Sequence, residues 1–301
     1  MTMKYHTVVT APPAGVACRC VAIVVHGAAE HSGRYATVLR ALAEQGVATV
    51  SGDLPGHGRS PGRRGDIDHF DHYLDAAEHF LEIGRQRFGD QLPLVLFGHS
   101  MGGLICALLA ARQAQAPESG TRDAASAPPS PKADGLVLTS PSFATAIRIS
   151  RSRLWLAKSL LPFMPRLYQS NQIQAINLTR SAAVIAAHGD DRLISRQITL
   201  RWYFAFRDAM ARALPAAAQI TIPTAVFQAG ADRIVDVAAT RAWFERLASP
   251  VKSYREYPEM YHELLNEPEA DEVLRDILAW LRAAFPADWT RAPRTPREAA
   301  P

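Results

Sequence analysis

The chain is poor in cysteine: its 301 residues include only Cys18, Cys20 and Cys106. They form no Cys-x-x-Cys pair, and the histidines do not cluster at the spacing of a zinc site. Both absences argue against a disulfide framework and against a structural metal. A reducing compartment such as the cytoplasm fits this composition best.

Strong charge of one sign is also missing, because the formal net charge is +4. That balance is too small to predict nucleic acid as a partner. Residues 92–111 carry no acidic or basic side chain besides a histidine, but a proline and three glycines interrupt this run. We expect a strand, a turn and a helix there, not a membrane span. Residues 7–18 do not predict an export signal either, because Pro12 and Pro13 break their apolar run.

What the chain does contain is a regular alternation of apolar strands and amphipathic helices. Strands are predicted at 21–25, 47–50, 94–97, 136–138, 222–228 and 254–257. The helices between them are predicted after a Ser32 cap, at 70–81, at 103–112, at 237–247 and at 270–285. This order predicts an α/β fold, with a mostly parallel sheet covered by helices on both faces.

One insertion interrupts the pattern. Residues 142–214 have a mainly helical pattern with no clear strand, so we expect a core of residues 1–141 and 215–285 with a helical insertion between its parts. Residues 116–132 are rich in proline, serine and alanine, which predicts a mobile surface loop. Residues 286–301 are rich in proline, arginine and alanine, which predicts a disordered tail.

The first candidate for chemistry is Ser100, in the pentapeptide Gly-His-Ser-Met-Gly at 98–102. Gly-x-Ser-x-Gly permits a strained turn between strand and helix that exposes a serine hydroxyl for nucleophilic attack. The pattern alone is weak, but here it follows an apolar strand and opens an apolar helix. That context predicts that Ser100 is a nucleophile.

A serine nucleophile of this kind needs an acid and a base, in that order along the chain. Asp232 and His262 each follow a predicted strand, at the sheet edge where open α/β sheets place their sites. We therefore expect His262 to accept the proton of Ser100 and Asp232 to orient His262. Asp236 is the rival acid, but it falls at a helix start, where a carboxylate serves as a cap.

The transition state also needs two N–H donors for the developing oxyanion. One is predicted at Met101, directly after the nucleophile, and the other at Ala28, in the loop after the first apolar strand. In the same loop, His26 is better interpreted as a structural residue that holds the loop by hydrogen bonds.

These motifs resemble the monoacylglycerol lipase and lysophospholipase family, a group of S33-like α/β hydrolases. The resemblance rests on three segments: His-Gly-Ala-Ala-Glu-His-Ser-Gly-Arg-Tyr at 26–35, Asp-Leu-Pro-Gly-His-Gly-Arg-Ser at 53–60, and Gly-His-Ser-Met-Gly-Gly at 98–103. It implies an α/β-hydrolase fold in which the insertion forms a cap over an acyl pocket. It also implies hydrolysis of single-chain lipid esters, such as monoacylglycerol or lysophospholipid, without a cofactor.

The resemblance further implies that Glu30 and Arg34 bind the alcohol part of the substrate, although these two residues also suit a local ion pair. Two departures bear on the substrate: Ala29 stands where glycine is frequent in the family, and Leu265 stands where some lipases carry a polar residue. A broad-specificity carboxylesterase therefore stays open as an alternative. An aminopeptidase or a non-enzymatic receptor on the same fold is a weaker alternative.

The insertion has its own charge pattern. Between 142 and 214 it carries eleven Arg and Lys residues and three Asp, a local balance of +8. Its apolar residues around Trp155 and Phe163 are flanked by basic ones, which suits a helix lying on an anionic lipid surface. We favour the interpretation as a cap whose apolar face covers the acyl pocket and whose basic face is solvated, and the two can coexist. The first interpretation predicts peripheral membrane contact, and neither predicts an oligomeric state.

Overall fold

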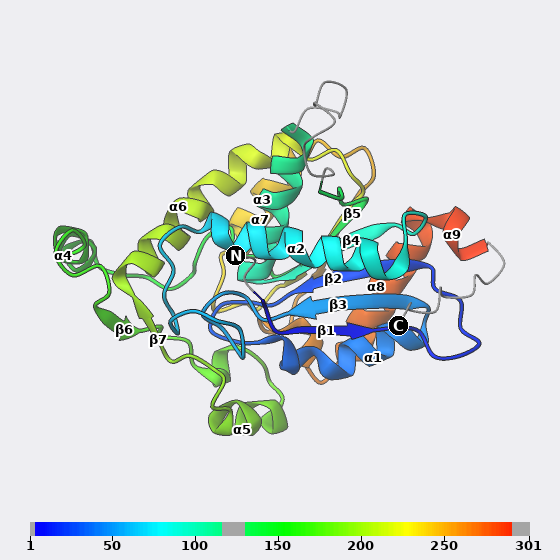
Figure 1. Cartoon of the computed structure of the whole chain (residues 1–301). Helices are drawn as coiled ribbons and strands as arrows, with labels where there is room; N and C mark the ends of the chain where they lie inside the picture. The colour runs from blue at the N-terminus through cyan, green and yellow to red at the C-terminus, as the bar shows by residue number, and fades with distance from the viewer. Residues whose placement is uncertain (1–3, 116–129, 291–301) are drawn as a thin grey trace.

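The computed structural model describes residues 4–115 and 130–290 (Figure 1). Its core is a seven-stranded sheet in the order β1-β3-β2-β4-β5-β8-β9, parallel except for β1, which pairs antiparallel with β3. The strands are β1 (Thr7–Thr10), β2 (Cys20–Val25), β3 (Val47–Gly52), β4 (Leu94–His99), β5 (Gly135–Thr139), β8 (Thr224–Ala229) and β9 (Lys252–Tyr257). Of these seven strands, the sequence analysis missed the edge strand β1, which is short and half-exposed.

Helices cover both faces of this sheet, as predicted. Alternate residues of β2 enter two separate hydrophobic clusters, which explains why the whole strand is apolar. One cluster packs against α2 (Asp71–Phe88), α3 (Met101–Gln115) and α7 (Val237–Arg246). The other packs against α1 (Ala36–Glu44) and α8 (Ala270–Ala284). The predicted fold class is confirmed by this arrangement.

The chain leaves the sheet after β5 and returns at β8. Between them lie α4 (Arg151–Leu160), β6 (Tyr168–Ser170), η2 (Ala175–Asn177), α5 (Ala182–Asp190), β7 (Gln197–Thr199), α6 (Leu200–Ala216) and η3 (Ala217–Gln219). The expectation that this segment has no strand was wrong, because β6 and β7 form an antiparallel pair. Each has only three residues and includes polar ones, which is too short for an alternating pattern to stand out.

We call the inserted segment from α4 to η3, residues 151–219, the cap. Part of the cap is tied closely to the core. The buried carboxylate of Asp66 accepts hydrogen bonds from the Thr199 hydroxyl and the Arg201 guanidinium. A second tie joins the Arg180 guanidinium of the cap to the Glu267 carboxylate of the core. In contrast, α4 contains no buried residue and protrudes from one end of the molecule in Figure 1.

Two further expectations were wrong in part. Ser32 does not cap a helix: it belongs to η1 (Ser32–Tyr35), and its hydroxyl donates to the buried Asp53 carboxylate at 2.7 Å. The predicted tail begins with α9 (Pro286–Thr290), where Trp289 packs against the second hydrophobic cluster. Residues 291–301 lie outside the described residues, as do residues 116–129 of the predicted loop. Among the described helices, none combines the length and apolar character needed to cross a membrane.

Candidate active site

Ser100 lies in a sharp turn between the end of β4 and the first residue of α3. Its backbone is left-handed, with φ of 54°, a conformation that costs a residue with a Cβ atom about 1–2 kcal/mol. The flanking glycines allow this turn to pack closely. A Cβ atom at Gly98 would lie 2.3 Å from the Gly102 carbonyl oxygen, and one at Gly102 would lie 2.0 Å from that of Val25.

The structure brings the three predicted residues together at the carboxyl ends of β4, β8 and β9. The Ser100 hydroxyl lies 2.8 Å from Nε2 of His262, and Nδ1 of His262 lies 2.7 Å from Oδ2 of Asp232. The other Asp232 oxygen accepts backbone N–H bonds from Ile234 and Val235, which fix the carboxylate. Nδ1 of His262 therefore donates to Asp232, while Nε2 accepts from Ser100.

The rival acid Asp236 lies where the sequence placed it, at the start of α7. Its carboxylate caps this helix by accepting the N–H groups of Ala238 and Ala239.

The electrostatics of the site favour a basic His262. Burial is the largest influence and opposes the charged imidazolium, but the Asp232 carboxylate, with smaller contributions from Glu263 and Glu30, raises the pKa of His262. The ring of His99 lies 4.9 Å from that of His262. Burial, followed by the neighbouring His262, lowers the pKa of His99 to about 4, so His99 is neutral at pH 7. Of these two adjacent histidines, only His262 is suited to carry a proton during a reaction.

The backbone amides predicted as oxyanion donors are those of Met101 and Ala28. Met101 is the first residue of α3, where N–H groups have no intrahelical acceptor. Neither its N–H nor that of Ala28 has a backbone acceptor within the described residues. The loop of Ala28 is fixed by His26, whose Nε2 accepts the N–H of Leu54 at 3.0 Å, in agreement with the structural interpretation of His26.

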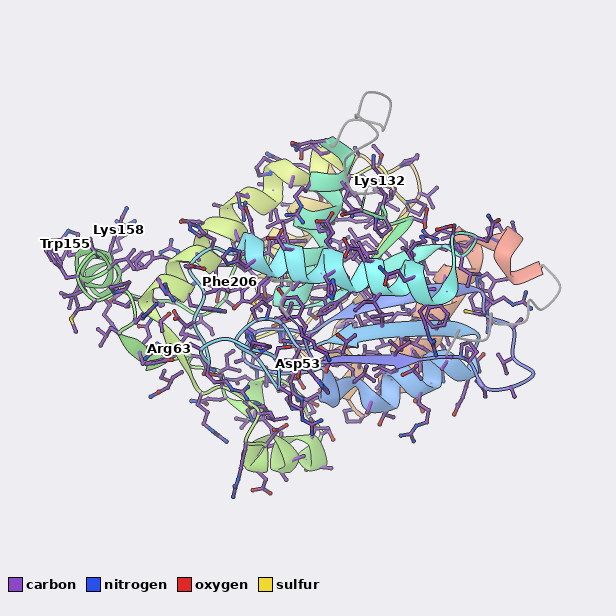
Figure 2. The ribbon with its side chains drawn as sticks, in the orientation of Figure 1. Asp53, Arg63, Lys132, Trp155, Lys158 and Phe206 are labelled. Atoms are coloured by element: carbon purple, nitrogen blue, oxygen red, sulfur yellow. The ribbon has the colours of Figure 1, made fainter. Side chains whose placement is uncertain are left out.

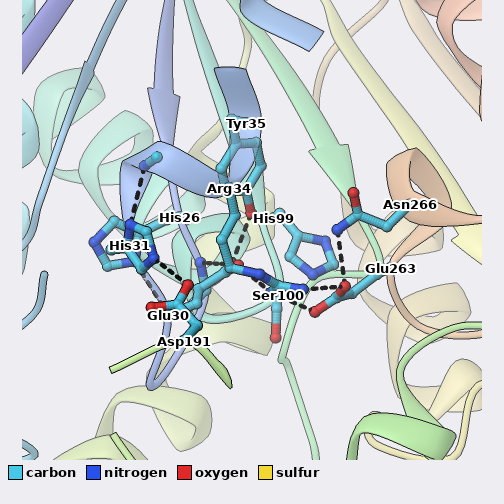
Figure 3. A network of polar contacts seen from close by, with 12 residues as sticks. His26, Glu30, His31, Arg34, Tyr35, His99, Ser100, Asp191, Glu263 and Asn266 are labelled. Atoms are coloured by element: carbon cyan, nitrogen blue, oxygen red, sulfur yellow. Dashed lines mark hydrogen bonds and ion pairs between the residues drawn. The ribbon is translucent and has the colours of Figure 1, made fainter. Parts of the chain in front are cut away.

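Glu30 and Arg34 form the ion pair that their spacing suggested, with Nη1 and Oε2 2.7 Å apart. Burial is the largest influence and would raise the pKa of Glu30, but Arg34, with smaller contributions from His99, His26 and the Tyr35 hydroxyl, lowers this pKa to about 2. Figure 3 shows that Arg34 lies between Glu30 and a second carboxylate, that of Glu263. The sequence analysis gave no role to Glu263, although it directly follows His262.

A second missed residue is Ser142, whose hydroxyl lies 3.1 Å from that of Ser100. It follows β5, the strand next to β4, so only the strand order reveals that the two serines meet.

A cavity opens at Ser100 and continues under the cap. Its walls beyond Ser100 are mostly apolar side chains from the cap and from the loop after β8: Ile198, Trp202, Phe206, Met210, Ile234 and Val235. A charged part of its lining is formed by Glu30, Arg34, Glu263 and the neighbouring His188, and the cap adds polar residues at 169–172 and 195–196. Leu265, in contrast, packs against the second hydrophobic cluster. The cavity therefore combines an apolar region with a smaller charged one, and Ser100 and His262 belong to its wall.

Comparison with known proteins agrees with this geometry. Residues 17–269 match the family model described as serine aminopeptidase, S33. The phospholipase YtpA of Bacillus subtilis is 32% identical over 261 residues, which cover 86% of this chain and 94% of that protein. The human monoglyceride lipase is 30% identical, with 91% and 86% covered.

A solved structure is similar over almost the whole chain. The monoacylglycerol lipase of Paleococcus ferrophilus superposes with a TM-score of 0.79 at 28% identity, covering 94% of this chain and all of that one. The match extends over the sheet that carries Ser100, Asp232 and His262. The chain is therefore a carboxylic ester hydrolase with the α/β-hydrolase fold, and it belongs to the serine aminopeptidase S33 family.

Proposed function

We propose that this chain cleaves single-chain lipid esters, such as monoacylglycerol or lysophospholipid, with Ser100, Asp232 and His262 as its catalytic residues. The observation that carries the proposal is the hydrogen-bonded series from Ser100 through His262 to Asp232, of which Ser100 and His262 line a cavity with a large apolar region. Relatives named as a phospholipase and as monoglyceride lipases support this class of substrate.

In the proposed mechanism, the Ser100 oxygen attacks the ester carbonyl carbon while Nε2 of His262 takes the serine proton. The N–H groups of Ala28 and Met101 stabilise the oxyanion that forms. When the intermediate collapses, His262 gives the proton to the leaving alcohol, and the acyl group stays on Ser100. A water molecule then attacks the carbonyl carbon of the acyl group while His262 takes a proton from the water. When this second intermediate collapses, the bond to the Ser100 oxygen breaks, His262 returns the proton to that oxygen, and the fatty acid leaves.

The two parts of the cavity suit the two parts of such a substrate. The apolar region under α6 accommodates an acyl chain, whose burial contributes about 0.8 kcal/mol per methylene. The charged region around Glu30 and Arg34 suits the alcohol group. Glu30 and Glu263 are the acidic residues of this lining, and Arg34 pairs with both. This pairing disfavours an aminopeptidase, which would need an available carboxylate for the substrate ammonium.

A fluorophosphonate probe tests the catalytic assignment. It should label the protein at Ser100, and the label should be lost in Ser100→Ala while Ser142→Ala keeps it. Labelling that survives in Ser100→Ala would refute the assignment. A series of p-nitrophenyl esters, with monoacylglycerol and lysophospholipid beside it, tests the substrate. A preference for acetate or butyrate would favour the broad carboxylesterase instead.

We further propose that the cap touches an anionic membrane surface through α4 and the residues after it. Trp155 is 72% exposed and Phe163 is 83% exposed, which is unusual for large apolar side chains. Figure 2 shows Trp155 together with Lys158 on the protruding helix. Apolar residues bordered by basic ones are what binding to an anionic lipid interface requires.

Vesicle sedimentation tests this contact. Vesicles with anionic lipid should bind the wild type, whereas Trp155→Ser combined with Phe163→Ser should abolish most of the binding. Val251→Ser, a change at an exposed apolar residue of the core, is the matched control and should bind normally. If the double variant binds as tightly as the wild type, the contact does not occur through this surface.

A further inference from the structure

Arg34 joins two loops that carry different parts of the catalytic machinery. Its Nη1 lies 2.7 Å from Oε2 of Glu30 and 2.6 Å from Oε1 of Glu263. Its Nη2 donates to the second Glu263 oxygen at 2.8 Å. The Arg34 side chain is only 10% exposed, and those of both glutamates are less exposed still. Buried, bidentate pairs of this kind hold their partners in a fixed orientation.

The Glu30 side of this bridge supports the loop of the proposed oxyanion donor. Oε1 of Glu30 accepts the backbone N–H of Gly27 at 2.6 Å and the Tyr35 hydroxyl at 2.7 Å. Gly27 directly precedes Ala28. A shift of the Glu30 carboxylate would therefore move the peptide that presents the Ala28 N–H.

The Glu263 side supports the loop of the proposed base. Glu263 follows His262 in the chain, so a fixed carboxylate also limits the movement of the His262 backbone. Asn266 donates to the same carboxylate at 2.8 Å, and the Glu263 N–H donates to the Leu178 carbonyl oxygen of the cap. Through Arg34, the base loop is thus linked to the oxyanion loop (Figure 3).

The charges of this cluster do not cancel. Two carboxylates, those of Glu30 and Glu263, face the single guanidinium of Arg34. They raise the pKa of Arg34 against the effect of burial and so keep it charged. The remaining negative charge lies near His262. His262 faces Asp232 as well, together with the neutral His99 and the Ser100 hydroxyl. Asp232, Glu263 and Glu30 all favour its imidazolium form.

We propose that Glu263 is a positioning residue of the reaction. Fixed by Arg34, Glu263 holds the backbone of the adjacent His262 and stabilises the protonated form of His262 during proton transfer. This inference rests on the proposed function, because it assumes that His262 is the base. It assigns to Arg34 the role of a bridge between loops, in addition to any contact with the substrate alcohol.

The test compares Glu263→Gln with Glu267→Gln. The first removes one charge of the cluster but keeps an oxygen that accepts from Arg34. The second is a matched control, because Glu267 is a buried glutamate of the same loop whose partner is Arg180 instead. For each variant, kcat, KM and the pH profile of kcat/KM are measured on a p-nitrophenyl ester, and the melting temperature shows whether the protein is folded.

In Glu263→Gln we expect kcat to fall by roughly tenfold to a hundredfold at an unchanged KM, the size of effect that slight misplacement of a catalytic group produces. The acidic limb of the pH profile should move to lower pH by about one unit, because the imidazolium loses a neighbouring negative charge. Glu267→Gln should leave this limb in place, even if it lowers the melting temperature.

An unmoved limb in a folded Glu263→Gln would refute the proposal, as would an increase in KM without a change in kcat. If Glu263→Gln does not fold, Arg34→Lys replaces it: it keeps the charge but cannot join both loops bidentately, so kcat should fall while the limb stays. A normal kcat in Arg34→Lys would then refute the bridge. Fluorophosphonate labelling of Ser100 in the wild type separates these failures from a failure of the proposed function.

Discussion

The left-handed backbone of Ser100 predicts an unusual order of stability among its variants. Ser100→Gly and Ser100→Ala both remove the hydroxyl and its hydrogen bonds. The difference between their free energies of unfolding therefore reports the cost of the backbone conformation. At φ of 54°, a residue with a Cβ atom is strained by about 1–2 kcal/mol, and glycine is not. The greater freedom of glycine in the unfolded chain offsets about 0.4–1 kcal/mol of this. Ser100→Gly should therefore be the more stable by about 0.5–1 kcal/mol.

Thermal unfolding of both variants in one buffer measures this difference. For a chain of this size, the expected gap corresponds to a melting temperature about 1–2 °C higher for Ser100→Gly. Ala279→Gly, at an exposed position inside α8, is the control, because alanine is ordinarily more stable than glycine inside a helix. This substitution should lower the free energy of unfolding by about 1 kcal/mol. If Ser100→Ala equals or exceeds Ser100→Gly in stability, the turn does not store the strain that its geometry indicates.

Four other predictions concern the catalytic residues, the cavity and the attachment of the cap. Asp232→Asn should lower kcat by about four orders of magnitude, measured at saturating ester, because an amide favours the wrong tautomer of His262. Since the pKa of His262 is raised and only its neutral form is a base, kcat/KM of the wild type should fall as the pH drops through a value above the ordinary histidine pKa of about 6.5. Met210→Trp should fill part of the apolar cavity and shift the preferred p-nitrophenyl ester to a shorter chain, visible as a changed ratio of kcat/KM values. Asp66→Asn should destabilise the protein by about 3 kcal/mol in urea unfolding, because it disrupts a buried ion pair, whereas Asp71→Asn, in an exposed pair, should cost less than about 1 kcal/mol.

The sequence predicted those parts of the site that depend on local pattern and on order along the chain. The glycines and the strand–helix context pointed to Ser100, and the order along the chain and the positions after strands pointed to Asp232 and His262; the structure brings these three side chains within hydrogen-bond distance. Glu263 and Ser142 were missed because their roles depend on contacts across the structure. Glu263 meets Arg34 over a separation of 229 residues, and Ser142 meets Ser100 only because β4 and β5 are neighbours.

The fold was predicted to a similar extent. The buried parallel strands and amphipathic helices gave clear periodic patterns, whereas β6 and β7 were too short for one. Ser32 shows a further limit, because its pattern suited a helix cap, but the buried Asp53 carboxylate offers it a stronger partner. Trp289 likewise gives α9 an apolar contact that the composition of the segment does not suggest.

The order of the strands also has a consequence during protein synthesis. Ser100 follows the central strand β4 and belongs to the first third of the chain, whereas His262 follows β9, the last strand and one edge of the sheet. If Ser100 and His262 act as proposed, a growing chain that already contains the nucleophile has no base until β9 has emerged and paired with β8. Hydrolytic activity should consequently appear late, once nearly the whole sheet has formed, and a partly synthesised chain should be inert toward the esters around it.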